Sequence, residues 1–499
     1  MESAASVQLQ GNLYSLLAFV GYLLIITAIG IFTARFSSKG VREYFIGGRN
    51  MNRFVVALSA VVSGRSSWLL LGVTGMAYKI GPSAVWAVVG YILAELLLFL
   101  FYAKRLRRFS EEYDCITLPD FFAARFNDKS GLLRLTLAVV ILIFMVSYVS
   151  AQFVGGGKAF AASFHIDNTS GIIITAAIVL LYTLLGGFLA VSLTDMIQAF
   201  FMIFALIILP VIAIADRGGL SILLQQLQAL DPKYIDPFAI SLGTAIGFLG
   251  IGLGSPGNPH IIARYMSIDD PEQLRFSAVV GTVWNVLMAW GALFIGLAGR
   301  VYFPDVSMLP GNDTENLYPV LALQHLHPVL FGVVVASIFA AIMSTADSQL
   351  LVAASSIVRD IYERIIKKGR QIPQKKLVLY SRLSVFLLVV FALILGMLAN
   401  ELVFWLVLFA WAGLGASLGP TSILSLYWKG TTRSGIFAGL ITGTLVTIVW
   451  YNIPLLKNTF YELIPAFILS FIMVIVVSKF TQPPENIKTH FQAMGKRKQ

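Results

Sequence analysis

Long apolar runs alternate with short polar segments along almost the whole of this 499-residue chain. A helix of about 20 residues crosses the roughly 30 Å of hydrocarbon in a bilayer, and most of the runs reach that length. They predict thirteen membrane-spanning helices, over residues 13–34, 53–79, 83–103, 133–162, 170–191, 193–215, 236–258, 276–300, 328–352, 377–399, 402–427, 434–452 and 458–478. No polar segment is long enough for a second core, so we expect one all-α polytopic membrane domain.

The composition agrees with a protein that is solvated by lipid. Hydrophobic residues make up 58% of the chain and charged residues only 12%. A net charge of +11 would suit a nucleic-acid-binding protein, but the positive residues cluster in the loops between predicted spans. We therefore expect a lipid bilayer, and no nucleic acid, as the surroundings of this chain. With Cys115 as its single cysteine, the chain forms no intrachain disulfide.

The loops alternate in charge, which predicts the orientation. Those over 34–53, 104–114 and 358–376, together with the tail, are rich in Lys and Arg, whereas the loops over 165–170, 216–238 and 301–328 are not. Basic loops face the cytoplasm, so thirteen spans put the N-terminus outside and the C-terminus in the cytoplasm. We expect a multi-pass protein of the cell (inner) membrane.

Two of the predicted spans carry helix-breaking stretches. The second span contains "SAVVSGRSSW", residues 59–68, and the seventh contains "GFLGIGLGSPGNP", residues 247–259. Freed backbone groups at membrane depth need partners, so such breaks persist only where they are buried or line a wet cavity. The breaks lie five spans apart, as in transporters built from inverted repeats, whose binding site lies at the broken helices. The alternative is a pair of Pro/Gly kinks that serve packing.

The ninth span carries a third polar stretch, "FAAIMSTADSQLLVAASS". Ser344 and Thr345 are adjacent hydroxyls in an apolar helix, and Asp347 follows two residues later. Small and hydroxylated residues often serve close helix packing, which the pair taken alone favours. Hydroxyls beside the free carbonyls of an unwound segment also form an oxygen-rich cage for a hard monovalent cation.

Five stretches together resemble the sodium:solute symporter family, and most of all its sodium/proline symporter branch: "REYFIGGRNMNRFVVALSA", "TLPDFFAARF", "YTLLGGFLAVSLTDMIQA", "NPHIIARYM" and "AAIMSTADSQLLVAASS". The resemblance implies a leucine-transporter-like fold with a 5+5 inverted repeat. The expected parts are an outside N-terminus, first span and cytoplasmic loop (1–52), a first repeat (53–215), a second repeat (236–427), two additional spans (428–478) and a cytoplasmic tail (479–499).

The resemblance also implies a Na⁺ site between the first broken span and the ninth span. Its ligands would be the backbone carbonyls of Val62, Arg65 and Ala341 and the hydroxyls of Ser344 and Thr345.

Two acids are further candidates for ion coupling. Asp195 matches a family aspartate that is linked to the sodium route, and Asp347 is the second candidate. On physical grounds alone, Asp195 could equally be the N-cap of the sixth span.

The expected substrate pocket keeps some residues of the proline branch and loses others. Residue types are kept at Phe54, Trp68, Tyr148 and Pro259, whereas Ile251 and Ser255 replace two aromatic residues, Gln152 adds an amide, and Gly64 and Arg65 replace an aspartate and an apolar residue. The loss of two aromatic walls enlarges the pocket and removes stacking surface. An aliphatic or hydroxylated molecule of similar or larger size than proline fits that change.

Arg65 is the main departure from the family pattern, and three interpretations are open. Its carbonyl could bind Na⁺ while its side chain pairs with a carboxylate such as Asp347 or Glu95. Alternatively, the side chain could clamp a substrate carboxylate. In the third, the guanidinium occupies the cation site and transport needs no Na⁺.

These observations predict a secondary active transporter that imports a small organic solute with Na⁺ as the coupling ion, by alternating access. An amino acid such as proline, or a carboxylate, is the expected solute. No catalytic constellation is present, so we do not expect an enzyme. One alternative is a sodium-independent or proton-coupled transporter or exchanger in which Arg65 replaces the cation. A solute sensor that acts with a partner protein is the less favoured one.

Overall fold

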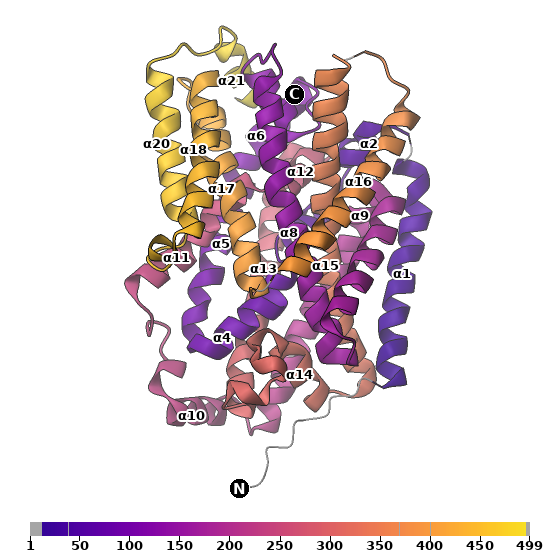
Figure 1. Cartoon of the computed structure of the whole chain (residues 1–499), viewed down its shortest axis with the longest axis vertical. Coiled ribbons are helices and arrows are strands. Elements are labelled where there is room, and N and C mark those ends of the chain that lie inside the picture. Colours follow the sequence, from indigo (N-terminus) through magenta and orange to yellow (C-terminus); the bar gives the residue numbers. More distant parts are fainter. Residues whose placement is uncertain (1–11, 38, 369, 400, 496–499) are drawn as a thin grey trace.

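The computed structural model describes residues 12–37, 39–368, 370–399 and 401–495. The N-terminal residues 1–11 and the last four residues of the basic tail lie outside this range. Within it the regular structure is helical, apart from one isolated bridge between Met51 and Ile268. Nine of the described helices are long and apolar enough to cross a membrane by length and composition, and shorter apolar helices complete the bundle (Figure 1).

The first half of the chain forms the helices predicted for spans one to six. They are α1 (Leu13–Ser37), α3 (Arg53–Ser63) with η2 (Trp68–Val73) and α4 (Thr74–Ile80), α5 (Val85–Leu97) with η4 (Leu98–Tyr102) and α6 (Ala103–Glu112), α8 (Leu132–Phe164) and α9 (Asn168–Asp216).

The second half forms the remaining spans. They are α11 (Leu242–Gly250) with η6 (Ile251–Gly257) and α12 (Pro259–Ser267), α13 (Leu274–Tyr302), α15 (Pro328–Ser355) with η11 (Ser356–Ile366), α16 (Gln374–Leu398), α17 (Val403–Tyr427), α18 (Arg433–Asn452) and α20 (Leu463–Lys479). Span seven ends at Ser267 rather than at residue 258, because α12 continues it beyond the break. Short helices in the connections are α2 (Val41–Ile46), α7 (Leu118–Arg125), α10 (Leu220–Leu230), α14 (Leu317–His325), α19 (Pro454–Lys457) and α21 (Ile487–Gly495).

A glycine separates the two membrane helices that run together as α9. Gly187 has φ 58° and ψ −172°, a conformation that residues with a Cβ rarely adopt. The sixth span therefore starts at this glycine, earlier than the boundary at residues 191–193 that the sequence suggested. Asp195 lies about two turns beyond it and is fully buried. The N-cap interpretation of Asp195 is thus wrong, because a cap residue stands at the helix start.

Both predicted helix breaks are present. The first lies between α3 and η2, where Ser66 has φ 49°. Gln152 of α8 stabilises this break, since its Oε1 accepts hydrogen bonds from the amide of Ser67 at 3.0 Å and from its hydroxyl at 2.9 Å. The second break is the 3₁₀ segment η6 between α11 and α12. Gly252 of η6 packs directly on the backbone of Gly90 in α5, where no Cβ would fit.

The helices differ in how deeply they lie in the bundle. The most apolar stretches of α15 and α17 are 83% buried, against 28% in α1 and 33% in α18. These two helices form the centre, and the broken helices pack against them. α2, α6 and α21 lie at one end, and α10 and α14 lie at the opposite end (Figure 1). We call the first the basic end, because it carries the basic loops around α2 and α6.

Candidate functional site

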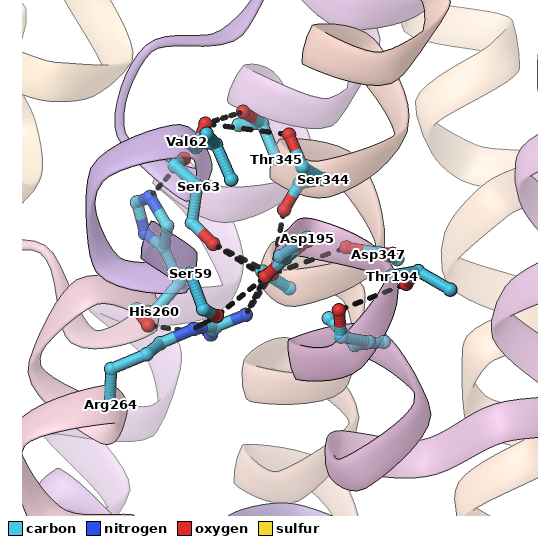
Figure 2. A network of polar contacts seen from close by, with 12 residues as sticks. Ser59, Val62, Ser63, Thr194, Asp195, His260, Arg264, Ser344, Thr345 and Asp347 are labelled. Atoms are coloured by element: carbon cyan, nitrogen blue, oxygen red, sulfur yellow. Dashed lines mark hydrogen bonds and ion pairs between the residues drawn. The ribbon is translucent and has the colours of Figure 1, made fainter. Parts of the chain in front are cut away.

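The hydroxyls of Ser344 and Thr345, here called the hydroxyl pair, face the broken end of α3. Ser344 Oγ lies 3.4 Å and Thr345 Oγ1 lies 3.5 Å from the carbonyl oxygen of Val62. Ser344 Oγ also lies 3.2 Å from the carbonyl oxygen of Ala341, one turn earlier in α15. Figure 2 shows the hydroxyl pair directed at Val62. Four of the five expected ligand oxygens are therefore neighbours.

These spacings suit a small hard cation. A cation about 2.4 Å from its oxygen ligands holds adjacent octahedral ligands about 3.4 Å apart. The carbonyl of Arg65, the fifth expected ligand, accepts the amide of Leu69 at 3.0 Å. A carbonyl oxygen has two lone pairs, so this bond leaves one for a cation. Among the described residues, no group of three or more His, Cys, Asp or Glu side chains could hold a metal.

A buried polar network extends from the hydroxyl pair of α15 to residues of α3, α9 and α12 (Figure 2). Asp195 Oδ2 accepts hydrogen bonds from Ser59 at 2.6 Å and from Ser63 at 3.2 Å. The guanidinium of Arg264 donates to the same oxygen at 3.2 Å, and to Ser59 at 3.0 Å. Asp195 thus joins α9 to α3 and α12.

Ser348 links this network to the hydroxyl pair. Its hydroxyl donates to the carbonyl of Ser344 at 2.7 Å and is itself contacted by Arg264. Asp347 lies beside it, with Oδ1 3.2 Å from Ser348 Oγ. The network holds two acids, Asp195 and Asp347, and one arginine, Arg264, which forms its ion pair with Asp195. Each acid keeps one carboxylate oxygen without a hydrogen bond to the described residues. A buried network with this charge balance favours a nearby cation.

A small cavity lies beside the break in α3. It has a volume of only ≈ 10 Å³, room for about one water molecule, and is lined by Gly64, Arg65, Trp68, Tyr91, Tyr148, Ile251, Val407, Leu408 and Trp411. Both broken helices contribute to it, and α5, α8 and α17 complete the wall. This volume is far below the roughly 300–1,000 Å³ of pockets for drug-sized ligands, so this central cavity is nearly closed in the present conformation.

The guanidinium of Arg65 is held on one side by groups outside the cavity lining. Its Nε donates to Asn285 Oδ1 at 2.6 Å, and its Nη2 forms an ion pair with Glu95. Asn285 in turn donates to the carboxylate of Glu95 at 2.7 Å. The guanidinium also lies 3.7 Å from the centre of the Tyr91 ring. Of the two carboxylates proposed as partners of Arg65, the structure pairs it with Glu95 and not with Asp347.

The structure brings only some of the predicted substrate residues together. Gly64, Arg65, Trp68, Tyr148 and Ile251 line the central cavity.

The other predicted residues lie elsewhere. Phe54 is 42% exposed at the start of α3 and packs on Phe276. Pro259 lines a separate, narrow cavity of ≈ 20 Å³ on the basic side of the network. Gln152 stabilises the break in α3, and the buried hydroxyl of Ser255 has no hydrogen-bond partner among the described residues.

Sequence reasoning missed much of the cavity wall. Neither Tyr91 nor Trp411 was predicted as a cavity residue, although Tyr91 lies in the same span as Glu95, and Trp411 donates to the carbonyl of Ile251 at 2.8 Å. Val407 and Leu408 cannot be told from lipid-facing residues by type. The role of Asn285 could have been predicted, because an amide in an apolar helix needs a hydrogen-bond partner.

The comparisons with known proteins agree with this architecture. The structure of a Na⁺-coupled sialic acid symporter, in a substrate-bound outward-open state, superposes with a TM-score of 0.80 over 95% of this chain and 99% of that one, at 19% identity. The predicted all-α, leucine-transporter-like fold is confirmed. The chain is 38% identical over 466 residues to the osmoregulated proline transporter OpuE of Bacillus subtilis (strain 168), covering 93% of this chain and 94% of the relative. It is 37% identical over 498 residues to a sodium/proline symporter of Staphylococcus aureus (strain JH9), covering 97% and 96%.

Fold and sequence together define a multi-pass membrane transporter, not an enzyme. Residues 44–443 match the family model described as "Sodium:solute symporter family". The chain belongs to the sodium:solute symporter family, and its activity is sodium-coupled solute transport.

Proposed function

We propose that this protein imports a small amino acid of the proline type together with Na⁺. The observation that carries the proposal is the hydroxyl pair, which faces the carbonyl of Val62 at 3.4 and 3.5 Å at the break in α3. The substrate is proposed from the relatives, since the two described above are named for proline. The central cavity, walled by Arg65 and by aromatic and aliphatic side chains, is nearly closed in this conformation and would have to widen to admit the solute.

In this proposal Na⁺ is bound by the carbonyls of Val62, Arg65 and Ala341 and by the hydroxyl pair. The ion bridges α3 and α15, so it binds best in the state that holds these helices together. The same break in α3 supplies Gly64, Arg65 and Trp68 to the cavity. Na⁺ therefore favours the conformation that is competent to bind solute, and solute raises the affinity for Na⁺ by the same factor.

The two routes to the site are lined differently. A wider vestibule bounded by α11, Trp405 and residues 451–462 shares Ile251 and Leu408 with the central cavity. On the other side of the polar network, the cavity that contains Arg264 and Ser348 extends toward the basic end. We propose that the vestibule is the outer entrance and the second cavity belongs to the inner exit. The basic end then faces the cytoplasm of a cell with this protein in its inner membrane.

The proposed repeats, residues 53–215 and 236–427, would move against each other around the site. Asp195 and Asp347, with Arg264, would receive Na⁺ as it leaves the hydroxyl pair toward the basic end. The sodium-independent alternative requires the guanidinium of Arg65 in the cation site. Its contacts are instead with Asn285, Glu95 and Tyr91, which favours sodium coupling.

Equilibrium binding tests the proposal. Radiolabelled proline is bound to purified protein in Na⁺ or K⁺ buffer, with unlabelled amino acids, hydroxylated amino acids and sugars as competitors. We expect saturable proline binding that requires Na⁺ and is displaced by amino acids but not by sugars. Binding that is equal in Na⁺ and K⁺ contradicts the sodium site, and displacement by sugars alone contradicts the solute class.

A further inference from the structure

Arg65 is the one charged residue among those that line the central cavity. Its side chain is 1% exposed, so its charge lies in surroundings of low dielectric constant. Glu95 is the counter-ion of Arg65, but it does not line the cavity. The surface that a solute meets therefore carries a positive group and no acid.

The guanidinium is only partly used by its protein contacts. An arginine side chain has five N–H donors in a planar fork. The described contacts use one for Asn285, one for Glu95 and one for a 3.3 Å bond to the carbonyl of Gly64. Two N–H groups remain for another acceptor.

Two more donors on the cavity lack hydrogen-bond partners. The indole Nε1 of Trp68 and the hydroxyl of Tyr91 are buried, and neither forms a hydrogen bond with the described residues. Trp68 and Tyr91 lie edge to face at 5.7 Å, and the Tyr91 ring covers the Arg65 guanidinium. Buried polar groups without a partner are uncommon, so three donors side by side indicate a ligand that accepts hydrogen bonds.

We propose, resting on the function proposed above, that Arg65 binds the carboxylate of the transported solute, with Trp68 and Tyr91 as additional donors. Glu95 and Asn285 are positioning residues, because they hold the guanidinium and touch no solute. The apolar body of the solute then packs on Tyr148, Trp411 and the aliphatic wall. The site selects a small carboxylic acid and rejects the corresponding amide or amine.

Arg65 would carry this selectivity through charge and geometry. A guanidinium binds a carboxylate through two parallel hydrogen bonds, which an ammonium group cannot reproduce. A carboxamide presents one acceptor oxygen and one NH₂ group, which would face the donors of Arg65 and Trp68. Loss of one charge-assisted bond in a buried site reduces affinity by about 30-fold or more.

The test compares acid and amide ligands in pairs, namely proline with prolinamide and alanine with alaninamide. Each competes with radiolabelled proline on the purified wild-type protein in Na⁺ buffer. We expect the acids to bind about 30-fold more tightly than the amides. In Arg65→Met/Glu95→Gln, which leaves no unpaired charge, the ratio should fall to within about 3-fold, and Arg65→Lys should lie between.

Arg107→Met/Glu111→Gln is the matched control, since it removes a buried arginine and its acid from α6, away from the cavity. It should keep the wild-type ratio. A Na⁺-induced rise in melting temperature identifies each variant as folded. The proposal is overturned if the double variant keeps the wild-type ratio, or if wild type binds the amides as well as the acids.

Failure of the proposed function gives a different result. In that case binding is indifferent to Na⁺ in wild type, whatever the ratio between acid and amide. If binding requires Na⁺ but is restricted to solutes without a carboxylate, the proposed role of Arg65 is wrong, whereas sodium coupling is supported.

Discussion

The guanidinium of Arg65 and the carboxylate of Glu95 form an ion pair inside the bundle, with side chains 1% and 2% exposed. Asn285 bridges them, donating to Glu95 and accepting from Arg65. This arrangement explains how an arginine can stand at a helix break at membrane depth, because each of the two charges has its counter-ion within the protein.

Glu95→Gln should destabilise the protein strongly. The substitution leaves the charge of Arg65 buried without a counter-ion, which costs about 3–5 kcal/mol. We expect a clear fall in melting temperature in detergent, largely restored in the double variant Arg65→Met/Glu95→Gln. A double variant with a lower melting temperature than Glu95→Gln would show that the unpaired charge of Arg65 does not cause the loss of stability.

Ser344→Ala should weaken Na⁺ binding by at least about tenfold, which corresponds to about 1.4 kcal/mol. The variant removes one ligand oxygen and leaves the helix intact, because alanine is the best helix former. The measurement is the Na⁺ concentration at half-maximal proline binding. Ser355→Ala is the control, since the hydroxyl of Ser355 donates to the carbonyl of Val352 in its own helix at 2.7 Å. If Ser344→Ala requires the same Na⁺ concentration as wild type, the hydroxyl pair does not bind the ion.

Asp195→Asn should lower Na⁺-driven uptake while leaving solute binding at saturating Na⁺ nearly intact. The amide can still accept a hydrogen bond, but it carries no charge, and Arg264 loses the partner of its ion pair. Initial uptake rates over a range of Na⁺ concentrations measure the effect, and we expect a fall of about tenfold or more at low Na⁺. Asp305→Asn, a loop residue that caps a short turn, is the control. Equal losses in both variants would make the effect non-specific.

Docking of α21 should depend on pH through His490. This side chain is buried between Phe109 and Tyr113 of the α6 region, and burial, with the nearby charge of Arg125, lowers its pKa to about 4. When α21 is undocked, the pKa of His490 returns to about 6.5. The undocked state therefore takes up protons first, so docking is strongest above pH 6.5 and weakens as the pH falls toward 4.

Hydrogen exchange of residues 487–495, corrected for intrinsic rates, tests this dependence. Exchange should be faster at pH 5 than at pH 7.5, and His490→Gln should flatten the difference. If the segment exchanges equally at both pH values in wild type, His490 is not the group that senses pH.

The fold could be predicted from the sequence largely because lipid imposes a simple rule. Apolar length alone located the helices. The first break was visible because Gly64, Arg65 and several serines interrupt an apolar run, and the second because it is rich in glycine and proline. The boundary inside α9 was missed because Gly186 and Gly187 lie in a continuous apolar run, where only the left-handed φ of Gly187 reveals the break.

The site was predictable where a residue type is unusual in a membrane helix. Ser344, Thr345, Asp195 and Arg65 stood out by chemistry, and the structure places the first two on Val62. Phe54 was misplaced because its helix position turns it to the surface at the basic end. The cavity wall from α17 was not predictable, because Val407 and Leu408 differ from lipid-facing residues only in their tertiary contacts.

Solute accumulation in proteoliposomes tests sodium coupling most directly. Radiolabelled proline uptake is followed under an inward Na⁺ gradient and under an equal choline gradient, in wild type and in Ser344→Ala. We predict that wild type accumulates proline only with the Na⁺ gradient and that Ser344→Ala accumulates little at low Na⁺. Equal uptake in Na⁺ and choline, with Ser344→Ala indistinguishable from wild type, would contradict the assignment of a Na⁺ site between α3 and α15.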